Sequence, residues 1–211
     1  MEKLIVTGGC GFIGSEFVRQ FQNKYEIFVI DSLTYAGNLK NIEGCAVEFF
    51  KEDIRDEEAM EKIFKEVNPD YVVNFAAESH VDRSIDSDLP FVATNTYGTA
   101  ILLNMARRYQ TKRFLHVSTD EVYGQIKNGS FSESDKLNPR NPYSASKTSA
   151  EHLVQSYHIT HKLDTVITRG ANTYGPRQFP EKLVPVSLDK LFTLNPKTLT
   201  SFNFIKHIRI I

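Results

Sequence analysis

The sequence is poor in three features, and each shortage argues against a class of protein. It has only two cysteines, Cys10 and Cys45, whose spacing lacks a metal-ligand pattern, so we expect no metal site and reduced thiols in the cytoplasm. The formal net charge is only −1, which gives no electrostatic reason to expect nucleic acid or an anionic membrane surface as a partner. Long apolar runs are missing, and the short apolar stretch at the N-terminus leads into glycines, so neither a membrane span nor a signal peptide is predicted.

What the sequence does contain is a regular alternation of short apolar runs with longer amphipathic ones. The apolar runs predict strands, and the amphipathic runs, whose apolar residues recur at three-and-four spacing, predict helices. Because the strands are continuous apolar runs, both faces of their sheet should be buried, which favours a parallel sheet. We therefore predict an α/β fold: a Rossmann-like, doubly wound parallel sheet with helices on both faces. The expected strands are 3–7, 25–31, 46–53, 70–77, 112–118 and 164–170, and the expected helices are 12–24, 56–67, 88–109 and 141–162.

A glycine-rich loop, TGGCGFIGS, follows the first predicted strand and opens the first predicted helix. Its spacings, Gly9-x-Gly11-x-x-Gly14 and Gly8-x-x-Gly11-x-x-Gly14, are weak signals by themselves but indicate dinucleotide binding between a strand and a helix. Glycine lets a pyrophosphate approach the backbone, and the helix N-terminus supplies free N–H groups. Asp31 ends the second strand, where a carboxylate binds ribose hydroxyls and repels a 2′-phosphate, so NAD is favoured over NADP. The alternative is a structural glycine turn with a surface aspartate.

Tyr143 and Lys147 stand four residues apart in the stretch NPYSASK, so a helix places both side chains on one face. A lysine ammonium near a phenol, with a nicotinamide cation adjacent, favours the phenolate and lowers the pKa of the tyrosine. A tyrosine of this kind can act as a general base toward a sugar or alcohol hydroxyl. An ordinary solvated pair is the alternative, and the nucleotide loop upstream makes it the less favoured one.

The stretch HVSTDEVYG places a hydroxyl and two adjacent carboxyl groups, those of Thr119, Asp120 and Glu121, at the tip of a buried strand. Two neighbouring carboxyl groups in a dry cleft cannot both ionise cheaply, so one should stay protonated and the pair should provide an acid and a base. A strand-end cap with a surface charge is the alternative. His116, inside the same strand, is expected to be a packed core histidine, and His80 a structural loop residue.

Taken together, these stretches resemble the extended short-chain dehydrogenase/reductase family, and within it the nucleotide-sugar 4,6-dehydratases. The resemblance runs through nearly all of residues 1–186. It is most specific in AAESHVDRS and STDEVYG, and the other matching stretches are TGGCGFIGS, DSLTYAGN, DIRD, TNTYGT, NPYSASK and NTYGPRQFPEKLVP. It implies an NAD-dependent lyase whose substrate is a small nucleotide-sugar, dTDP-glucose. It also implies a cytoplasmic homodimer formed through the two long helices near 88–109 and 141–162.

The resemblance implies a catalytic role for each of five residues. Tyr143, helped by Thr119 and Lys147, takes the proton of the glucose 4-hydroxyl while NAD takes a hydride from carbon 4. Glu121 then removes the proton of carbon 5, and a protonated Asp120 donates to the departing 6-hydroxyl. Return of the hydride to carbon 6 gives a 4-keto-6-deoxyglucose nucleotide and leaves the cofactor as it began.

The same resemblance implies which residues line the cofactor and the substrate. Those expected at NAD are Gly8, Gly11, Phe12, Ile13, Gly14, Asp31, Ser32, Leu33, Thr34, Asp53, Ile54, Phe75, Ala76, Ala77, Ser79, Thr94, Tyr143 and Lys147. Those expected at the substrate are Ser79, Thr119, Asn172, Lys182 and Leu183, with the last two near the nucleotide diphosphate.

After Val186 the sequence carries none of the family's motifs, whereas family members usually continue with a small C-terminal lobe that grips the nucleotide-sugar. We therefore predict an NAD-binding Rossmann domain with the catalytic residues at 1–186, and a divergent tail at 187–211 where the substrate lobe is truncated or replaced. Missing binding energy from such a lobe would impair turnover as well as affinity. Two alternatives stay open: a nucleotide-sugar epimerase or decarboxylase, against which Asp120 argues, and a non-catalytic NAD-binding module.

Overall fold

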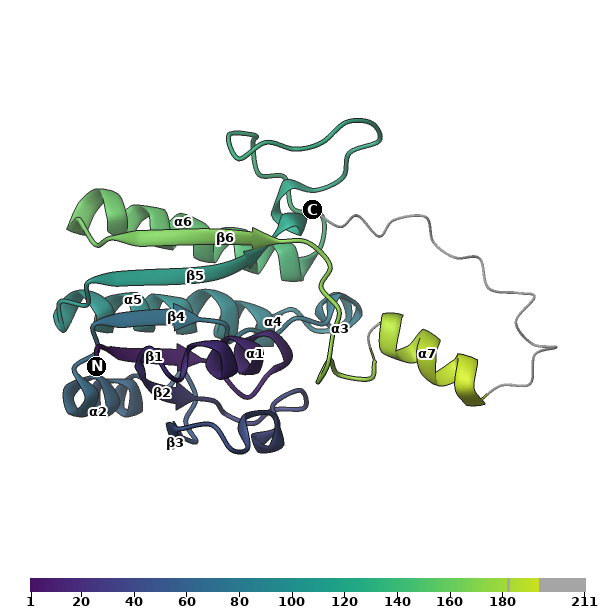
Figure 1. The fold of residues 1–211 in the computed structure, drawn as a ribbon. Coiled ribbons are helices and arrows are strands. Elements are labelled where there is room, and N and C mark those ends of the chain that lie inside the picture. Colours follow the sequence, from purple (N-terminus) through teal and green to yellow (C-terminus); the bar gives the residue numbers. More distant parts are fainter. Residues whose placement is uncertain (182, 194–211) are drawn as a thin grey trace. The chain divides into compact units, whose positions relative to one another are not determined.

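The structure is a computed structural model that describes residues 1–181 and 183–193 (Figure 1). The chain divides into two units, residues 1–170 and residues 171–211. The first unit carries the sheet and most of the predicted site residues. The second unit is described by itself below.

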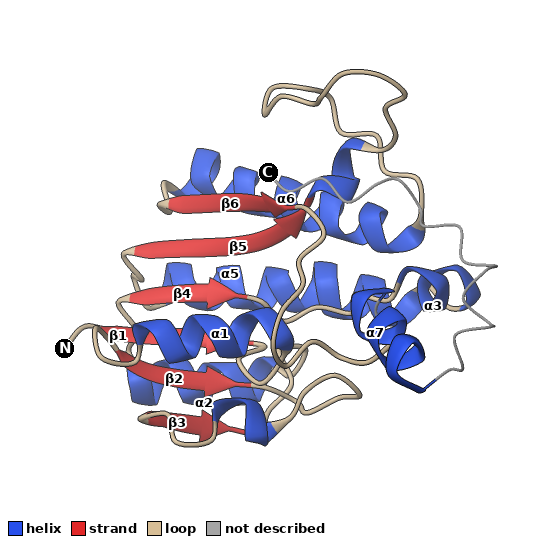
Figure 2. Cartoon of the chain, turned by 45° about the vertical axis from the view of Figure 1, so that its right-hand side comes forward, coloured by secondary structure: helices blue, strands red, loops and turns tan. Residues whose placement is uncertain are grey.

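Residues 1–170 contain a six-stranded sheet in which every neighbouring pair is parallel. Its strands are β1 (Lys3–Thr7), β2 (Glu26–Ile30), β3 (Val47–Phe50), β4 (Tyr71–Asn74), β5 (Arg113–Thr119) and β6 (Thr165–Gly170). They lie in the order β3-β2-β1-β4-β5-β6, and their arrowheads point the same way in Figure 2. The order reverses between β1 and β4, so the loops that leave these two strands diverge and open the crevice in which doubly wound folds bind ligands.

Helices cover both faces of the sheet, as the sequence predicts (Figure 2). One face packs against α1 (Phe12–Phe21) and the short 3-10 helix η1 (Leu39–Ile42), with Val18 and Ile42 buried against apolar side chains of β1 and β2. The other face packs against α2 (Glu57–Val67), α5 (Thr99–Arg108) and α6 (Pro142–His161). Met60, Phe64 and Leu102 are fully buried there. Burial of both faces explains why the strands read as unbroken apolar runs, and the predicted fold class is confirmed.

The ends of α2 and α6 follow from local chemistry. The Asp56 carboxylate accepts a hydrogen bond from Ala59 N (2.9 Å) at the start of α2, and Asn68 ends that helix in the left-handed region with φ 47°. Asn141 starts α6 with its side-chain oxygen accepting from Ser144 N (2.7 Å), and Pro142 occupies the first turn. Both starts are capping arrangements that stabilise otherwise unpaired N–H groups.

The single helix predicted at 88–109 is wrong in its first half. The structure has a short helix α4 (Leu89–Phe91), a π-helical segment η2 (Val92–Gly98), and only then the regular helix α5. The apolar spacing of this stretch does not report the hydrogen-bond register, which is what changes here. Two other short helices, α3 (Val81–Asp86) and the 3-10 helix η3 (Asp120–Tyr123), are absent from the prediction because their sequences are short and polar.

Two predicted strands are shorter in the structure than in the prediction. The strand expected at 46–53 ends at Phe50, and the strand expected at 70–77 ends at Asn74. The residues cut off, 51–53 and 75–77, form loops at the carboxyl edge of the sheet. Loop residues at this edge are free to contact a ligand, which strand residues buried between helices are not.

The second unit contains one described helix, α7 (Leu183–Thr193). This helix crosses residue 186, where the predicted Rossmann domain gives way to the predicted tail. Residues 194–211 of that tail lie outside the described residues. Within residues 1–181 and 183–193, no helix combines the length and the apolar character needed to cross a membrane.

Candidate active site

The glycine loop between β1 and α1 is shaped by close backbone contacts. Gly8 has φ +68°, and a Cβ atom there would lie 2.6 Å from Ala76 N. A Cβ on Gly14 would collide with the carbonyl oxygen of Gly8. Gly11, which has no side chain to cap the helix, starts α1 and leaves the N–H groups of its first turn available. The loop therefore presents bare backbone donors at a helix N-terminus, which suits a phosphate group.

Asp31 ties this loop to the segment that follows β2. The side chain is 9% exposed, and its Oδ2 accepts a hydrogen bond from Cys10 N (2.9 Å) while Oδ1 accepts from Leu33 N (2.8 Å). Burial raises the pKa of the Asp31 carboxyl group, against the lowering effect of these two bonds. Burial, with a smaller contribution from Asp31, also raises the pKa of the Cys10 thiol to about 12. Cys10 is thus an unreactive packed thiol, and Asp31 keeps lone pairs free for ribose hydroxyls.

The residues predicted around the rest of the cofactor lie in loops at the same edge of the sheet. Asp53 forms an ion pair with Arg55 (2.6 Å), and Ile54 is buried against Gly98 of η2. Thr94 belongs to η2, and Phe75, Ala76, Ala77 and Ser79 follow β4, with Ala77 exposed. Ser32 and Thr34 belong to the loop after β2, in which Leu33 has φ 53°.

Asn95 is a residue of this edge that sequence reasoning missed. It is fully buried in η2, and its side chain accepts from Glu78 N (2.9 Å) and donates to Glu78 O (3.0 Å) and to Ser146 Oγ (2.9 Å). It therefore holds the loop after β4 against α6. This inward-facing side chain lies in a π-helical segment, for which the sequence carries no direct signal.

Thr119, Asp120 and Glu121 lie where β5 ends and η3 begins. The Thr119 hydroxyl accepts a hydrogen bond from Glu121 N (3.2 Å), which starts η3 and keeps the two carboxyl groups at the strand tip. Partial burial raises the pKa of the Asp120 carboxyl group, while contacts with Thr119 and nearby backbone lower it. The Tyr143 phenol hydrogen-bonds Thr119 and is influenced by the charges of Glu121 and Asp120. The structure thus brings the predicted triplet and Tyr143 together, although they come from different elements.

Lys147 is not among the groups that shift the pKa of Tyr143 in this structure, and its predicted effect together with a nicotinamide cation stays a prediction. Burial, followed by the charge of Glu121, raises the pKa of Tyr143 to about 12, and the contact that lowers it comes from Thr119. Lys147 is buried and points elsewhere: its Nζ donates to Val117 O (2.8 Å) and lies 3.3 Å from His116 Nε2. Burial lowers the pKa of Lys147 to about 8, while the Glu151 carboxylate raises it. His116 is fully buried, which confirms it as a core histidine.

Asn141 is a second residue that sequence reasoning placed only as a helix start. Its Oδ1 accepts from Ser144 N, and its Nδ2 donates to Glu121 Oε2 (3.1 Å). An amide nitrogen only donates, so Oε2 of Glu121 is the acceptor in this contact. The N-terminal end of α6 lies at the same point and favours negative charge. The motif NPY predicts that Asn141 caps the helix but does not predict its contact with Glu121.

Four residues singled out in the sequence remain: His80, expected to be a structural loop residue, and Asn172, Lys182 and Leu183, expected at the substrate. His80 caps α3 through a ring nitrogen that accepts from Arg83 N (3.4 Å). Asn172 is exposed and, like Leu183, belongs to the second unit. Lys182 lies outside the described residues. The roles predicted for these last three residues stay predictions.

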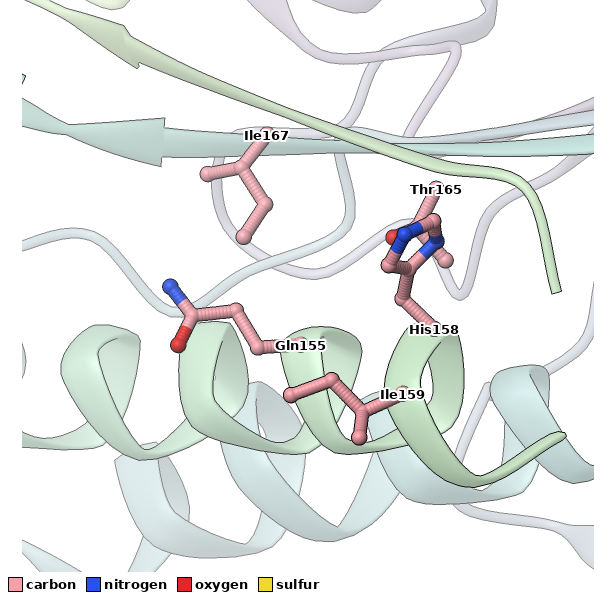
Figure 3. Close-up of a pocket in the computed structure, with 5 residues that line it drawn as sticks. All are labelled: Gln155, His158, Ile159, Thr165 and Ile167. Atoms are coloured by element: carbon pink, nitrogen blue, oxygen red, sulfur yellow. The ribbon is translucent and has the colours of Figure 1, made fainter. Parts of the chain in front are cut away.

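A pocket of about 300 Å³ lies between α6 and β6 (Figure 3). Gln155, His158 and Ile159 of α6 and Thr165 and Ile167 of β6 line it. These residues belong to the second half of α6 and the amino-terminal half of β6, whereas Thr119 and Gly170 pair at the carboxyl end of β5 and β6. The pocket is therefore separate from the candidate active site and contains none of the predicted site residues.

The glycine loop, the acidic end of β2 and the Tyr143–Lys147 pair on a parallel sheet together define a class, the short-chain dehydrogenases/reductases. A family model described as GDP-mannose 4,6 dehydratase matches residues 5–203. Among curated relatives, the low-salt glycan biosynthesis protein Agl12 of Haloferax volcanii is 47% identical over 98% of this chain and 67% of its own length. A dTDP-glucose 4,6-dehydratase of an Actinoplanes species is 46% identical over 90% of this chain and 62% of its own.

Solved structures point to the same group. The crystal structure of DesIV, a dTDP-glucose 4,6-dehydratase from Streptomyces venezuelae with NAD and TYD bound, superposes with a TM-score of 0.86 at 46% identity, over 90% of this chain and 62% of that one. The chain belongs to the GDP-mannose 4,6-dehydratase family within the extended short-chain dehydrogenases/reductases. It spans roughly two thirds or less of the length of these relatives, from 62% to 67%.

Proposed function

We propose that this chain carries the NAD-binding and catalytic part of a nucleotide-sugar 4,6-dehydratase that acts on dTDP-glucose. The observation that carries the proposal is the Asp120–Glu121 pair, which follows Thr119 at the tip of β5. The charges of both carboxyl groups raise the pKa of one phenol, that of Tyr143, so all three groups lie close together. An elimination of water needs both a base and an acid beside one sugar, and this pair offers both. The dehydratases among the relatives support the same reaction.

The residues present fit NAD. The start of α1 offers backbone donors, and the absence of side chains at Gly8 and Gly11 leaves room for a pyrophosphate next to the loop. The Asp31 carboxylate at the end of β2 is positioned for the ribose hydroxyls and disfavours a 2′-phosphate. When bound, NAD supplies a hydride acceptor for carbon 4, returns the hydride to carbon 6, and adds a positive charge to the site.

Tyr143 and Thr119 are proposed to act on the 4-hydroxyl. The phenol is protonated in the chain as it stands, because burial and two carboxyl groups raise its pKa to about 12. Its hydrogen bond with Thr119 opposes that rise, and added positive charge favours the phenolate further. Tyr143 can then accept the proton of the sugar hydroxyl. Lys147, whose Nζ donates to Val117 O rather than to the phenol, is proposed to help in its protonated form.

Asp120 and Glu121 are proposed to divide the elimination between them. Asn141 donates to Oε2 of Glu121, which fixes this oxygen as an acceptor, so Glu121 acts as the base at carbon 5. Burial raises the pKa of Asp120, which favours its neutral form, so Asp120 acts as the acid toward the 6-hydroxyl. Asp120 gives up a proton in the same reaction in which Glu121 takes one, so the two carboxyl groups act as a coupled pair. Ser79, Asn172, Lys182 and Leu183 are proposed to contact the substrate.

Replacing Asn141 with serine tests this division of roles. Serine is as good a helix cap as asparagine, so the stability of α6 should be nearly unchanged. The donor to Glu121 is lost, however, and a charge-assisted hydrogen bond of this kind corresponds to about a ten- to hundredfold fall in turnover. Product formation and circular dichroism are measured together. Asp56→Ser, which exchanges the cap of α2, is the control, and equal turnover in both variants would contradict the role of Asn141.

The proposed function is tested by incubating the purified chain with NAD and dTDP-glucose, and in parallel with GDP-mannose. A 4-keto-6-deoxy product is detected by its alkali-induced ultraviolet absorbance. Product from dTDP-glucose supports the proposal, whereas a C4 epimer or released carbon dioxide would indicate an epimerase or a decarboxylase. NAD binding without any turnover would indicate a non-catalytic module.

We also propose a cytoplasmic homodimer. Four large apolar side chains gather on the consecutive segments α3, α4 and η2 and are exposed to solvent: Ile85 (66%), Leu89 (74%), Val92 (48%) and Tyr97 (53%). A patch of this kind is typical of a protein–protein interface. Light scattering should give a dimer, and Leu89→Glu should convert it to a monomer because it buries a charge. Leu39→Glu, on η1 at the opposite face of the sheet, is the control and should leave the dimer intact.

A further inference from the structure

A chain of buried hydrogen bonds runs from η2 to Lys147 and fixes where its protons lie. It starts at Thr99, whose hydroxyl lies 2.7 Å from the carbonyl oxygen of Asn95. A hydroxyl has one proton, and here that proton is donated to the carbonyl. The Thr99 oxygen can therefore only accept from its other neighbour, the side chain of Asn74, at 3.2 Å.

This requirement orients the amide of Asn74. Its Nδ2 must face Thr99, which leaves Oδ1 to accept from the Thr7 hydroxyl (2.7 Å). The same Nδ2 lies 3.3 Å from His116 Nδ1. Because an amide nitrogen only donates, Nδ1 must accept, and the single proton of a neutral imidazole must then be on Nε2.

His116 Nε2 faces Lys147 Nζ at 3.3 Å, and the two cannot both donate to each other. With the ring proton on Nε2, Nζ must accept, so this arrangement is that of a neutral lysine amine that also donates to Val117 O. A protonated Lys147 requires the opposite: an accepting Nε2, a proton on Nδ1, and an Asn74 amide turned to offer its oxygen to Nδ1.

We propose that His116 is a positioning residue that couples the protonation of Lys147 to Asn74 and Thr7, at the carboxyl ends of β4 and β1. When Lys147 takes up one proton, the proton of the His116 ring moves from Nε2 to Nδ1 and the amide of Asn74 turns over. Thr7 and Asn74 are the residues from which the glycine loop and the loop after β4 leave the sheet. A change in the charge of Lys147 therefore changes hydrogen bonds at the ends of both β1 and β4, the two strands that border the crevice.

The surroundings of the pair are consistent with a lysine that titrates. Burial lowers the pKa of Lys147 to about 8, and burial followed by the charge of Lys147 lowers that of His116 well below its usual range. Glu151, one turn further along α6, is the carboxylate that acts on Lys147, and it is itself paired with Arg169 of β6. Tyr143 is the titratable group on the preceding turn of α6. From β4, the uncharged side chain of Asn74 faces His116, and Asn74 in turn contacts Thr99 of α5.

The test follows two signals in one sample of the full chain labelled with nitrogen-15 and carbon-13. The ring nitrogens of His116 report the tautomer, and the side chain of Lys147 reports its charge, with assignments from His116→Gln and Lys147→Met. Above pH about 8 we expect a neutral lysine and the Nε2–H tautomer. Below it, both signals should change with one shared midpoint. An Nδ1–H tautomer at high pH, or a tautomer that stays constant while Lys147 titrates, would overturn the coupling.

Thr99→Val provides an isosteric variant. Valine removes the group that fixes Asn74, so the amide can turn freely and the charged lysine is favoured, which should raise the shared midpoint by about half to one pH unit. Thr111→Val is the matched control, because Thr111 is also buried and its hydroxyl has no hydrogen-bond partner among the described residues. Equal shifts in both variants would reject the proposal.

NAD affinity measured over the same pH range adds a functional readout. Of the measurements in this test, it is the only one that rests on the proposed function. It should show an inflection at the shared midpoint in the wild type and a displaced one in Thr99→Val. If the chain fails to bind NAD at all, the proposed function is contradicted, while the two nuclear signals still decide the coupling.

Discussion

Arg169→Met is expected to lower the free energy of unfolding by about 3–5 kcal/mol, because it leaves the carboxylate of Glu151 buried without a partner. Glu151 on α6 is 0% exposed, and Arg169 on β6 binds it through both Nε (3.0 Å) and Nη2 (2.7 Å). The same guanidinium donates from Nη1 to the hydroxyl of Tyr123 and to the carbonyl oxygen of Glu133. One side chain therefore joins a strand, a helix, η3 and the loop after it. Urea unfolding followed by circular dichroism measures the loss, since the chain has no tryptophan.

Two comparisons make this result specific to burial. Arg113→Met makes the same chemical change in an exposed ion pair with Asp164 and should cost less than about 1 kcal/mol. Adding Glu151→Met to Arg169→Met removes the unpaired charge and should recover much of the loss. If Arg169→Met destabilises no more than Arg113→Met, the buried pair does not hold these elements together.

Asp120→Asn is expected to reduce formation of the 4-keto-6-deoxy product by roughly 10²–10⁴-fold, the usual contribution of a general acid. The substitution keeps the size and shape of the side chain but removes its acidic proton. Oxidation at carbon 4 depends on Tyr143 and Thr119 instead, so it should persist and appear as an increase in reduced-cofactor absorbance. Single-turnover assays with dTDP-glucose separate the two steps.

NAD binding gives the reference for this variant. Within the part of the chain that the structure describes, Asp120 interacts with Thr119, Glu121 and Tyr143 and not with the glycine loop or Asp31, so the affinity for NAD should not change. Glu133→Gln, an exposed carboxyl group in the loop after η3, is the matched control and should retain full activity. Product formed by Asp120→Asn at the rate of the wild type would refute an acid role for this carboxyl group.

The parts of the fold that could be predicted are those whose burial repeats with the period of the element. Met60, Ile63, Phe64 and Val67 recur along one face of α2, and all four are buried, so the sequence predicts that helix almost to the residue. The prediction for the segment before α5 was wrong because the spacing of its residues does not report the hydrogen-bond register of the backbone. Val92–Gly98 contains helix-compatible residues, and its π-helical register depends on tertiary contacts such as those of Asn95, which no local pattern reveals.

The candidate site shows a similar boundary between what a motif can and cannot tell. Residue types and the end of a strand were enough to select Thr119, Asp120 and Glu121, because parallel strands gather their carboxyl ends at one edge. The four-residue spacing to Lys147 selected Tyr143. The direction in which the Lys147 side chain points could not be predicted from the sequence. Lys147 turns toward His116 rather than toward the phenol, a choice made by the packing of α6 on β5.

The length of β5 is under tight constraint. Successive side chains of a strand point to opposite faces, and in β5 Phe114 packs with the side chains of α5 and α6 while Leu115 and Val117 pack with those on the α1 side. Loss or gain of one residue between Lys112 and Thr119 would exchange the two sets and carry the imidazole of His116 to the wrong side. Natural variation in length should instead collect in the exposed segment 125–136, where an added residue changes neither face of the sheet.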